Sequence, residues 1–198
     1  MNSKRLFLQG IGGAALSATV IPAMSAAVSA RTPSQPPRAD YFTNVVVETH
    51  RGEKMRFYDQ VLRGKRVVIN MMYTACSGIC PGNTANLKKV HELLAGHLGK
   101  DVYMYSLTLR PEFDRPDALA AYMKQYRIDS GWTFLTGVPA EMDVIRRRLG
   151  FYDIDPKVDA DLAQHTGMVR IGNEALDRWC MVPALSSPKQ ICRAILDT

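Results

Sequence analysis

The chain has 198 residues, of which 46% are hydrophobic and 22% are charged, a composition that indicates one globular domain and excludes a disordered or collagen-like protein. Its net charge of +6 is spread along the chain, and the one dense basic cluster, Arg146 to Arg148, lies among apolar residues at helical spacing. This pattern is typical of a solvated helix face, so we expect no nucleic-acid-binding role. Beyond residue 30, no apolar run reaches the roughly 18 residues of a membrane span.

Residues 1–30 have the composition of an export signal. Lys4 and Arg5 precede an apolar stretch rich in Gly and Ala, and small residues ending at Ala30 form a cleavage pattern. We expect cleavage after Ala30; the alternative is an uncleaved anchor, which would be the chain's only contact with a membrane. The start also resembles a twin-arginine signal in which Lys4 replaces the first arginine. Both routes lead out of the cytoplasm, so we predict an exported, periplasmic protein in a compartment where disulfides persist.

A linker at 31–40, rich in proline and polar residues, joins this signal to a domain at 41–198 in which strands and helices alternate. The domain begins with two short strands around a turn at Arg51 and Gly52. The next strand is almost entirely apolar, which is typical of a strand buried on both faces. The expected strands are 44–50, 54–58, 66–73, 101–109, 132–137, 167–172 and 177–183, the last two forming a hairpin around Asn173-Glu174.

Helices are expected between the buried strands and at the C-terminus. Pro81 opens the first of them, and Asp114 and Pro116 form the cap and first turn of the second. Ser186 or Ser187 caps the last helix. The expected helices are 81–98, 117–126, 139–150 and 186–196.

This order of elements predicts an α/β fold, because helices that join buried strands imply crossovers and a sheet with helices on both faces. The layout resembles a thioredoxin-like domain. It has a central mixed sheet flanked by helices, an N-terminal β-hairpin extension, and a C-terminal hairpin and helix.

Two of the four cysteines, Cys76 and Cys80, lie between the end of the strand at 66–73 and the start of the next helix. Ligands bind at this edge of open α/β sheets. The positive end of a helix and its free N–H groups stabilise a thiolate, so we expect both cysteines to be reactive. Their C-x-x-x-C spacing permits a disulfide or the binding of one soft metal ion. From spacing alone, a surface disulfide without further function is an equally good interpretation.

Two thiolates leave a metal ion short of ligands, and His165, directly before the strand at 167–172, is the best candidate for a third. His50 lies in the N-terminal hairpin, and His91 and His97 lie further along the first helix. Two cysteines and one imidazole suit copper, because thiolate is soft enough for Cu(I) and imidazole also accommodates Cu(II). Zinc would accept the same atoms, but a structural zinc site takes four ligands and no fourth is evident. A single loop histidine is otherwise usually just solvated.

The other two cysteines, Cys180 and Cys192, fall in the last strand and the last helix. In an exported protein an even cysteine count favours a structural disulfide between them. The alternative is two small buried side chains. Met168 is near His165 in sequence and is a weaker ligand candidate, although a core position is the better interpretation for it.

The segment GKRVVINMMYTACSGICPGNTANL resembles the signature of the Sco/SenC family, copper-binding thioredoxin-like proteins that assist cytochrome c oxidase assembly. RPEFDRPDALAAYMKQY, WTFLTG and QHTGMV resemble the family's following segments, so the resemblance covers roughly residues 40–198. It implies copper, as Cu(I) or Cu(II), bound by Cys76, Cys80 and His165. It further implies a metallochaperone that delivers copper to a respiratory oxidase copper site or reduces that site's cysteines. The partner would be the oxidase's copper-site subunit or another periplasmic copper or thiol protein.

The sequence departs from the family pattern at four positions near the expected site. Ser77 and Gly78 stand where the family has proline and often an acidic residue, while Arg110 and Gln164 stand in place of aspartates. Fewer acids beside a cationic metal should weaken Cu(II) binding more than Cu(I) binding.

A second function remains open at this point: a thiol–disulfide oxidoreductase or redox-sensing protein that uses Cys76 and Cys80 without metal. One thiolate would attack a partner's disulfide and the other would resolve the mixed disulfide. Such an enzyme would not need His165.

Overall fold

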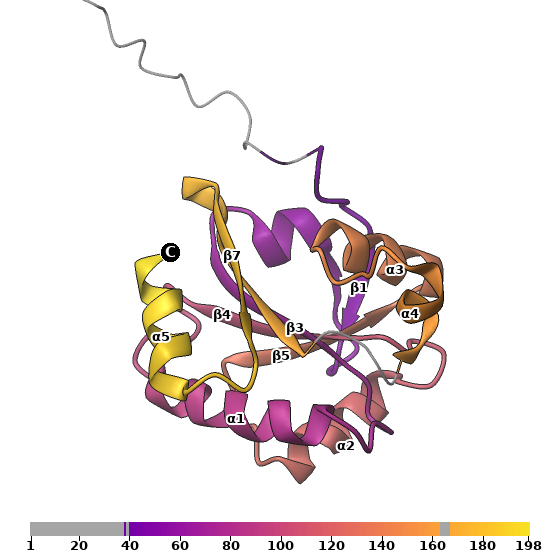
Figure 1. The fold of residues 1–198 in the computed structure, drawn as a ribbon, viewed down its shortest axis with the longest axis horizontal. Helices are drawn as coiled ribbons and strands as arrows, with labels where there is room; N and C mark the ends of the chain where they lie inside the picture. The colour runs from indigo at the N-terminus through magenta and orange to yellow at the C-terminus, as the bar shows by residue number, and fades with distance from the viewer. Residues whose placement is uncertain (1–37, 39, 163–166) are drawn as a thin grey trace, which may run out of the picture. The chain divides into compact units, whose positions relative to one another are not determined.

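The structure is a computed structural model that describes residues 38, 40–162 and 167–198 (Figure 1). The chain from Ser34 to Thr198 groups as one compact unit. The predicted export signal at 1–30 and nearly all of the predicted linker at 31–40 lie outside the described residues. No helix in the described part of the chain is both long and apolar enough to cross a bilayer.

A mixed sheet of seven strands forms the centre of the fold (Figure 1). The strands are β1 (Val46–Thr49), β2 (Lys54–Arg56), β3 (Arg66–Met72), β4 (Tyr103–Thr108), β5 (Trp132–Gly137), β6 (Met168–Asn173) and β7 (Arg178–Pro183). They lie in the order β2-β1-β5-β4-β3-β6-β7. β3, β4 and β5 run parallel, and the strands outside them run antiparallel to their neighbours. The carboxyl ends of β3 and β4 therefore meet at one edge of the sheet.

Helices cover both faces of this sheet. One face carries α1 (Cys80–Leu93), α2 (Pro116–Gln125) and α5 (Pro188–Asp197), and the other carries α3 (Pro139–Arg148) and the short helix η1 (Phe57–Leu62). Figure 1 shows α1, α2 and α5 on one side of the strands and α3 on the other. The predicted α/β class is confirmed, with its flanked mixed sheet, a hairpin (β1–β2) at the N-terminal end, and a hairpin (β6–β7) with a final helix at the C-terminal end.

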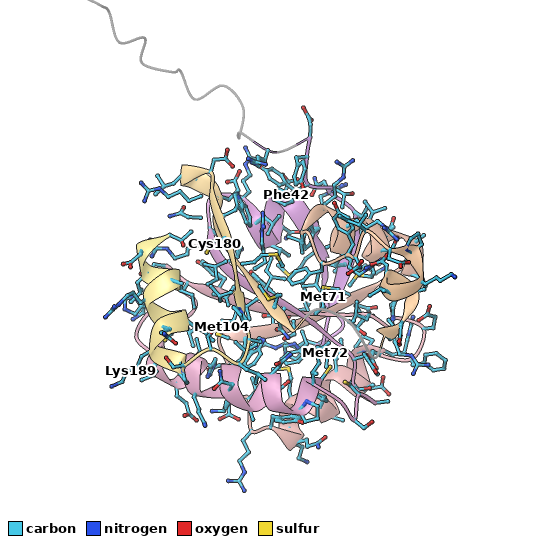
Figure 2. All side chains as sticks on the ribbon, in the orientation of Figure 1. Phe42, Met71, Met72, Met104, Cys180 and Lys189 are labelled. Carbon is cyan, nitrogen blue, oxygen red and sulfur yellow. The ribbon has the colours of Figure 1, made fainter. Side chains whose placement is uncertain are left out.

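β3 supplies side chains to two hydrophobic cores, one on each face of the sheet. Val68 and Met72 belong to the core beneath α1, α2 and α5, whereas Ile69 and Met71 belong to the core beneath η1 and α3. In Figure 2 the labelled Met71 and Met72 lie on different sides of the strand. Every residue from Val67 to Met72 is buried, so the predicted burial of this strand on both faces is confirmed.

The predicted strand at 54–58 is too long. β2 ends at Arg56, and Phe57 and Tyr58 begin the helix η1. The reason is visible in the sequence: Phe57, Tyr58, Val61 and Leu62 recur with helical spacing, and all four are buried on one side of η1.

A short helix, α4 (Pro156–Ala160), lies in a segment for which we predicted neither a helix nor a strand. None of its residues is buried, so it has no apolar periodicity from which to predict it. Its Asp159 accepts hydrogen bonds from Arg146 and Arg147 of α3, at 2.6 and 2.8 Å. The basic cluster is therefore not a merely solvated helix face, because two of its arginines tie α3 to α4.

The C-terminal hairpin turns later than predicted. Asn173 still belongs to β6, and the turn is made by the short helix η3 (Glu174–Leu176) with Asp177 in a left-handed conformation (φ 51°). Gly172 is required in β6, because a Cβ there would lie 2.1 Å from the ring of Trp179 on β7. Of the two serines proposed to cap α5, Ser187 is the cap: its side chain accepts a hydrogen bond from the N–H of Gln190.

Candidate functional site

The cysteine loop, residues 73–79, leaves the carboxyl end of β3 and leads into α1, whose first residue is Cys80. The N–H of Cys76 donates to the Tyr73 carbonyl at 3.2 Å, so the loop begins with a tight turn. Both sulfurs are sheltered, since Cys76 is 9% exposed and Cys80 is 2% exposed. Between them Ser77 and Gly78 are exposed, and a Cβ built on Gly78 would meet no atom of the described part of the chain within 4 Å. The predicted placement of the cysteines between a strand end and a helix start is confirmed.

The two thiols contact each other and have different acidities. Burial alone would raise the pKa of Cys76, but hydrogen bonds from the Cys80 thiol, the N–H groups of Cys80 and Gly78, and the Tyr73 hydroxyl outweigh it and lower this pKa. Burial raises the pKa of Cys80, and its hydrogen bond to Cys76 raises it further. Cys76 is therefore the sulfur that ionises first, while Cys80 keeps its proton longer.

Asp114 fastens the cysteine loop to the sheet. Its buried carboxylate accepts hydrogen bonds from the N–H of Thr74 at 3.0 Å, from the Thr74 hydroxyl, and from the Thr108 hydroxyl at the end of β4. Our prediction that Asp114 caps α2 is wrong: Arg115 holds that position, without a side-chain cap. The carboxylate turns inward because three donors at two neighbouring strand ends would otherwise be left without an acceptor.

A polar contact also supports the helix that follows the loop. One turn after Cys80, the Thr84 hydroxyl lies 2.8 Å from the Tyr122 hydroxyl of α2. Both side chains are buried in the core that also contains the two cysteines. The first turn of α1 is thus held from beneath by α2, which limits the movement of Cys80.

Three of the four histidines are used elsewhere. His50 Nδ1 accepts from the N–H of Phe134 at 3.3 Å, His91 Nε2 lies 2.6 Å from the Ser130 carbonyl, and His97 pairs with Asp101 at 2.9 Å. The fourth, His165, lies outside the described residues. Within residues 38, 40–162 and 167–198, no three His, Cys, Asp or Glu side chains gather as a set of metal ligands.

The described chain resumes next to the cysteine helix. A Cβ on Gly167 would lie 3.4 Å from Ile79 and 3.6 Å from the Asn83 amide, and the Gly167 carbonyl accepts from the N–H of Ala184 at 2.8 Å. Gly167 thus packs against the first turn of α1. Asn83 is buried, and its Oδ1 accepts no hydrogen bond from any residue that the structure describes.

The predicted disulfide between Cys180 and Cys192 is wrong, because all four cysteines are free thiols. The Cys180 sulfur faces the Thr198 hydroxyl at 3.8 Å, beyond the end of α5, and the Cys192 sulfur faces the Val90 carbonyl at 3.9 Å. Cys192 precedes Thr198 by six positions, about 9 Å along a helix, which exceeds the separation that a disulfide spans.

Met168 is half-buried against the core beneath η1 and α3. Both site cysteines belong to the other core. This favours the core interpretation of Met168 over a ligand role.

Two contacting thiols at a helix N-terminus have two chemical uses. As thiolates they bind a soft cation such as Cu(I), and on oxidation they form a disulfide. Motif spacing identified the cysteines but not Tyr73 or Asp114. The Tyr73 hydroxyl adds to the hydrogen bonds from Cys80 and Gly78 that lower the pKa of Cys76, and Asp114 fixes the loop. An aspartate or tyrosine near a predicted strand end is the only sequence signal for such residues, and it is weak.

The family model described as SCO1/SenC matches residues 42–197 of the chain. Protein sco1 of Schizosaccharomyces pombe is 27% identical over 122 residues, a match that covers 59% of this chain and 45% of that protein. The chain spans less than half the length of the curated relatives that it matches.

Solved structures share the fold. A SCO1/SenC family lipoprotein from Bacillus anthracis superposes with a TM-score of 0.64 at 21% identity, covering 79% of this chain and 93% of the other. ScoI of Bradyrhizobium japonicum with copper bound superposes with a TM-score of 0.61 at 21% identity, covering 77% and 95%. At these identities the likeness establishes the fold, and the α/β prediction is confirmed independently of the topology described above.

Proposed function

Because the chain belongs to the SCO1/SenC family, we propose that it is a metallochaperone that binds copper through Cys76, Cys80 and His165. Its cargo would be delivered to a respiratory oxidase copper site, or the protein would reduce the cysteines of that site. The observation that carries the proposal is the contact between the two thiols at the end of β3, with the pKa of Cys76 lowered. The copper bound to Bradyrhizobium japonicum ScoI is consistent with it.

The donor set suits Cu(I). Thiolates are soft ligands, and two of them within contact of each other can share one soft ion. Binding requires that Cys80, whose pKa is raised by burial, give up its proton, so copper uptake should release protons to solvent. Tyr73 and the N–H groups of Gly78 and Cys80 already orient the Cys76 sulfur toward its partner.

The third ligand of the proposed site is His165. His165 precedes Gly167 by two positions, a spacing that extended chain covers in about 7 Å. Gly167 itself contacts Ile79 and Asn83 beside Cys80. This proximity of position 167 to the cysteine helix supports His165 as the imidazole ligand.

Titration of the reduced protein with Cu(I) against a competing chelator tests the proposal. We expect one tightly bound Cu(I) per chain, and loss of that binding in Cys76→Ala, Cys80→Ala and His165→Ala. Cys192→Ala is the matched control, because this thiol lies on α5 and faces Val90 instead of the cysteine loop. If His165→Ala binds copper like the parent, the three-ligand site is wrong; a weak, non-stoichiometric response of the parent would contradict copper binding altogether.

The unequal acidity of the two cysteines also favours a second candidate function, a thiol–disulfide oxidoreductase. The Cys76 thiolate would attack a partner's disulfide and release one of the partner's thiols. Cys80 would then attack the Cys76 sulfur of the mixed disulfide, which releases the partner's second thiol and leaves Cys76 and Cys80 joined as a disulfide. In this case the reduction potential of the cysteine pair should be unchanged by His165→Ala. Equilibration of parent and variant with glutathione buffers measures that potential.

The N-terminal segment supports a proposal about the compartment in which the protein works. We propose that residues 1–30 direct export and that the domain works in the periplasm, either released or held by an uncleaved N-terminal segment. Fractionation of cells followed by mass determination of the mature protein tests both points, and an intact protein in the cytoplasm would contradict export.

A further inference from the structure

Arg110 holds a positive charge beside the cysteine loop. It lies in the turn after β4, where its N–H donates to the Thr108 hydroxyl at 2.9 Å. Its carbonyl accepts from the N–H groups of Phe113 and Asp114, at 3.0 and 2.9 Å. Thr108 and Asp114 are also the residues that fasten the cysteine loop, so the backbone of Arg110 is fixed relative to that loop.

Two aromatic rings hold the Arg110 side chain. Its guanidinium lies 4.3 Å from the ring centre of Phe113 and 5.9 Å from that of Tyr73, both within the range of a cation–π contact. Among the described residues no Asp or Glu lies within ion-pair distance of it. The charge of Arg110 is therefore not cancelled by a direct partner.

Tyr73 connects this cation to the site. The face of its ring contacts Arg110, and its hydroxyl donates a hydrogen bond to the Cys76 sulfur. Arg110 and Cys76 thus both interact with the Tyr73 side chain, one over its ring and the other at its hydroxyl. The guanidinium lies close enough for its field to act on a charge at the sulfur, while it remains outside the ligand set itself.

The charge of the copper site differs between the two oxidation states of the metal. Two thiolates carry −2, so the site with Cu(I) carries −1 and the site with Cu(II) is neutral, and a neutral imidazole changes neither value. A fixed cation stabilises the −1 state more. We propose that Arg110 is a specificity-determining residue that biases this site toward Cu(I) over Cu(II); the inference rests on the proposed copper function.

The expected size of the effect follows from Coulomb's law. A unit charge acting over roughly 10 Å changes an equilibrium by about twofold in a water-like dielectric and about fifteenfold at an effective dielectric near 20. Salt screens such an interaction over about 8–10 Å at physiological ionic strength. The buried carboxylate of Asp114 acts in the opposite direction, but it is the same in every variant below, so the comparison isolates Arg110.

The experiment compares Cu(I) and Cu(II) affinities of the full-length parent with those of Arg110→Gln, Arg110→Lys and Arg115→Gln. Each affinity is measured by competition with a chelator of known affinity for that ion. We expect Arg110→Gln to lower the ratio of Cu(I) to Cu(II) affinity by about two- to fifteenfold. Arg110→Lys keeps the charge and should stay near the parent. Arg115→Gln is the matched control, since Arg115 is an exposed arginine in the same segment with no ring contact to Tyr73.

A salt titration adds a second test, and its first part uses the parent alone. The parent's affinity ratio should fall as salt is raised from about 0.05 to 1 M, and this salt dependence should be weaker in Arg110→Gln. A ratio in Arg110→Gln equal to the parent's, or an equal drop in Arg115→Gln, would overturn the inference while leaving copper binding intact. A parent that binds no copper would instead contradict the proposed function.

Discussion

The two cysteine pairs of this chain differ in everything except residue type. Cys76 and Cys80 lie four positions apart at one strand-to-helix junction, and their sulfurs contact each other. Cys180 and Cys192 lie in β7 and α5, and each sulfur faces an oxygen from a different part of the chain.

Position in the fold explains this difference better than sequence spacing or cysteine count. At the helix start, free N–H groups and the Tyr73 hydroxyl lower the pKa of Cys76 in spite of its burial. On α5 no such donors act, and burial alone raises the pKa of Cys192. Cys76 and Cys80 are thus positioned to react or to bind a metal ion, whereas Cys180 and Cys192 act as small side chains packed against the core.

The largest difference between the pairs is expected on oxidation. Treating the reduced, metal-free protein with oxidised glutathione should link Cys76 to Cys80, because their sulfurs already contact each other. Cys180 and Cys192 should remain unlinked. Peptide mass mapping after blocking free thiols measures this, with Cys80→Ser expected to abolish the bridge and Cys192→Ser to leave it unchanged. A peptide that joins Cys180 to Cys192 would remove the distinction between the pairs.

The next largest effect should come from Asp114→Ala, which removes the anchor of the first pair only. The three donors from Thr74 and Thr108 would lose their acceptor, so we expect the free energy of unfolding to fall by about 2–4 kcal/mol. Denaturant titration measures it. Asp117→Ala, at an exposed position in the first turn of α2, is the control, with an expected loss of about 0.3–1 kcal/mol. Equal losses in the two variants would mean that the anchor has no special role.

The smallest effect concerns the pH dependence of thiol reactivity. Thiolate is the reactive form, and its fraction rises with pH, so the thiol with the lower pKa becomes reactive at lower pH. With the pKa of Cys76 lowered and that of Cys192 raised, iodoacetamide at pH 7 should modify Cys76 faster than Cys192. The Cys76 rate should also level off at a lower pH. Mass spectrometry of timed samples tests this, and faster labelling of Cys192 at pH 7 would reverse the assignment.

Much of the fold could be predicted because two sequence signals, an apolar run and the turn residues at its ends, identify each central strand. β5 has the predicted bounds, and β3 and β4 differ from theirs by one or two residues, since each is an apolar run bounded by turn residues. Elements without an apolar pattern escaped prediction. α4 buries no residue, and η1 follows β2 without any breaker between them.

The candidate site shows the same limit. Cys76 and Cys80 could be found because a local motif brings them together. Asp114 could not, because its partner Thr74 lies 40 positions earlier and only the sheet brings the two together. An aspartate followed by a proline two positions later is a common helix start. In this fold, however, the Asp114 carboxylate accepts hydrogen bonds from the donors at the strand ends instead of capping α2.

The open space at Gly78 has a practical consequence. Its φ is not positive, and a Cβ there would meet no atom of the described residues within 4 Å, next to an exposed Ser77. Positions 77 and 78 therefore contribute little to packing, and the hydrogen bonds to Asp114 hold the loop in place. Variants at 77 and 78 would change the surroundings of the two thiols on one unchanged scaffold, which makes this chain a convenient host for engineering thiol reactivity.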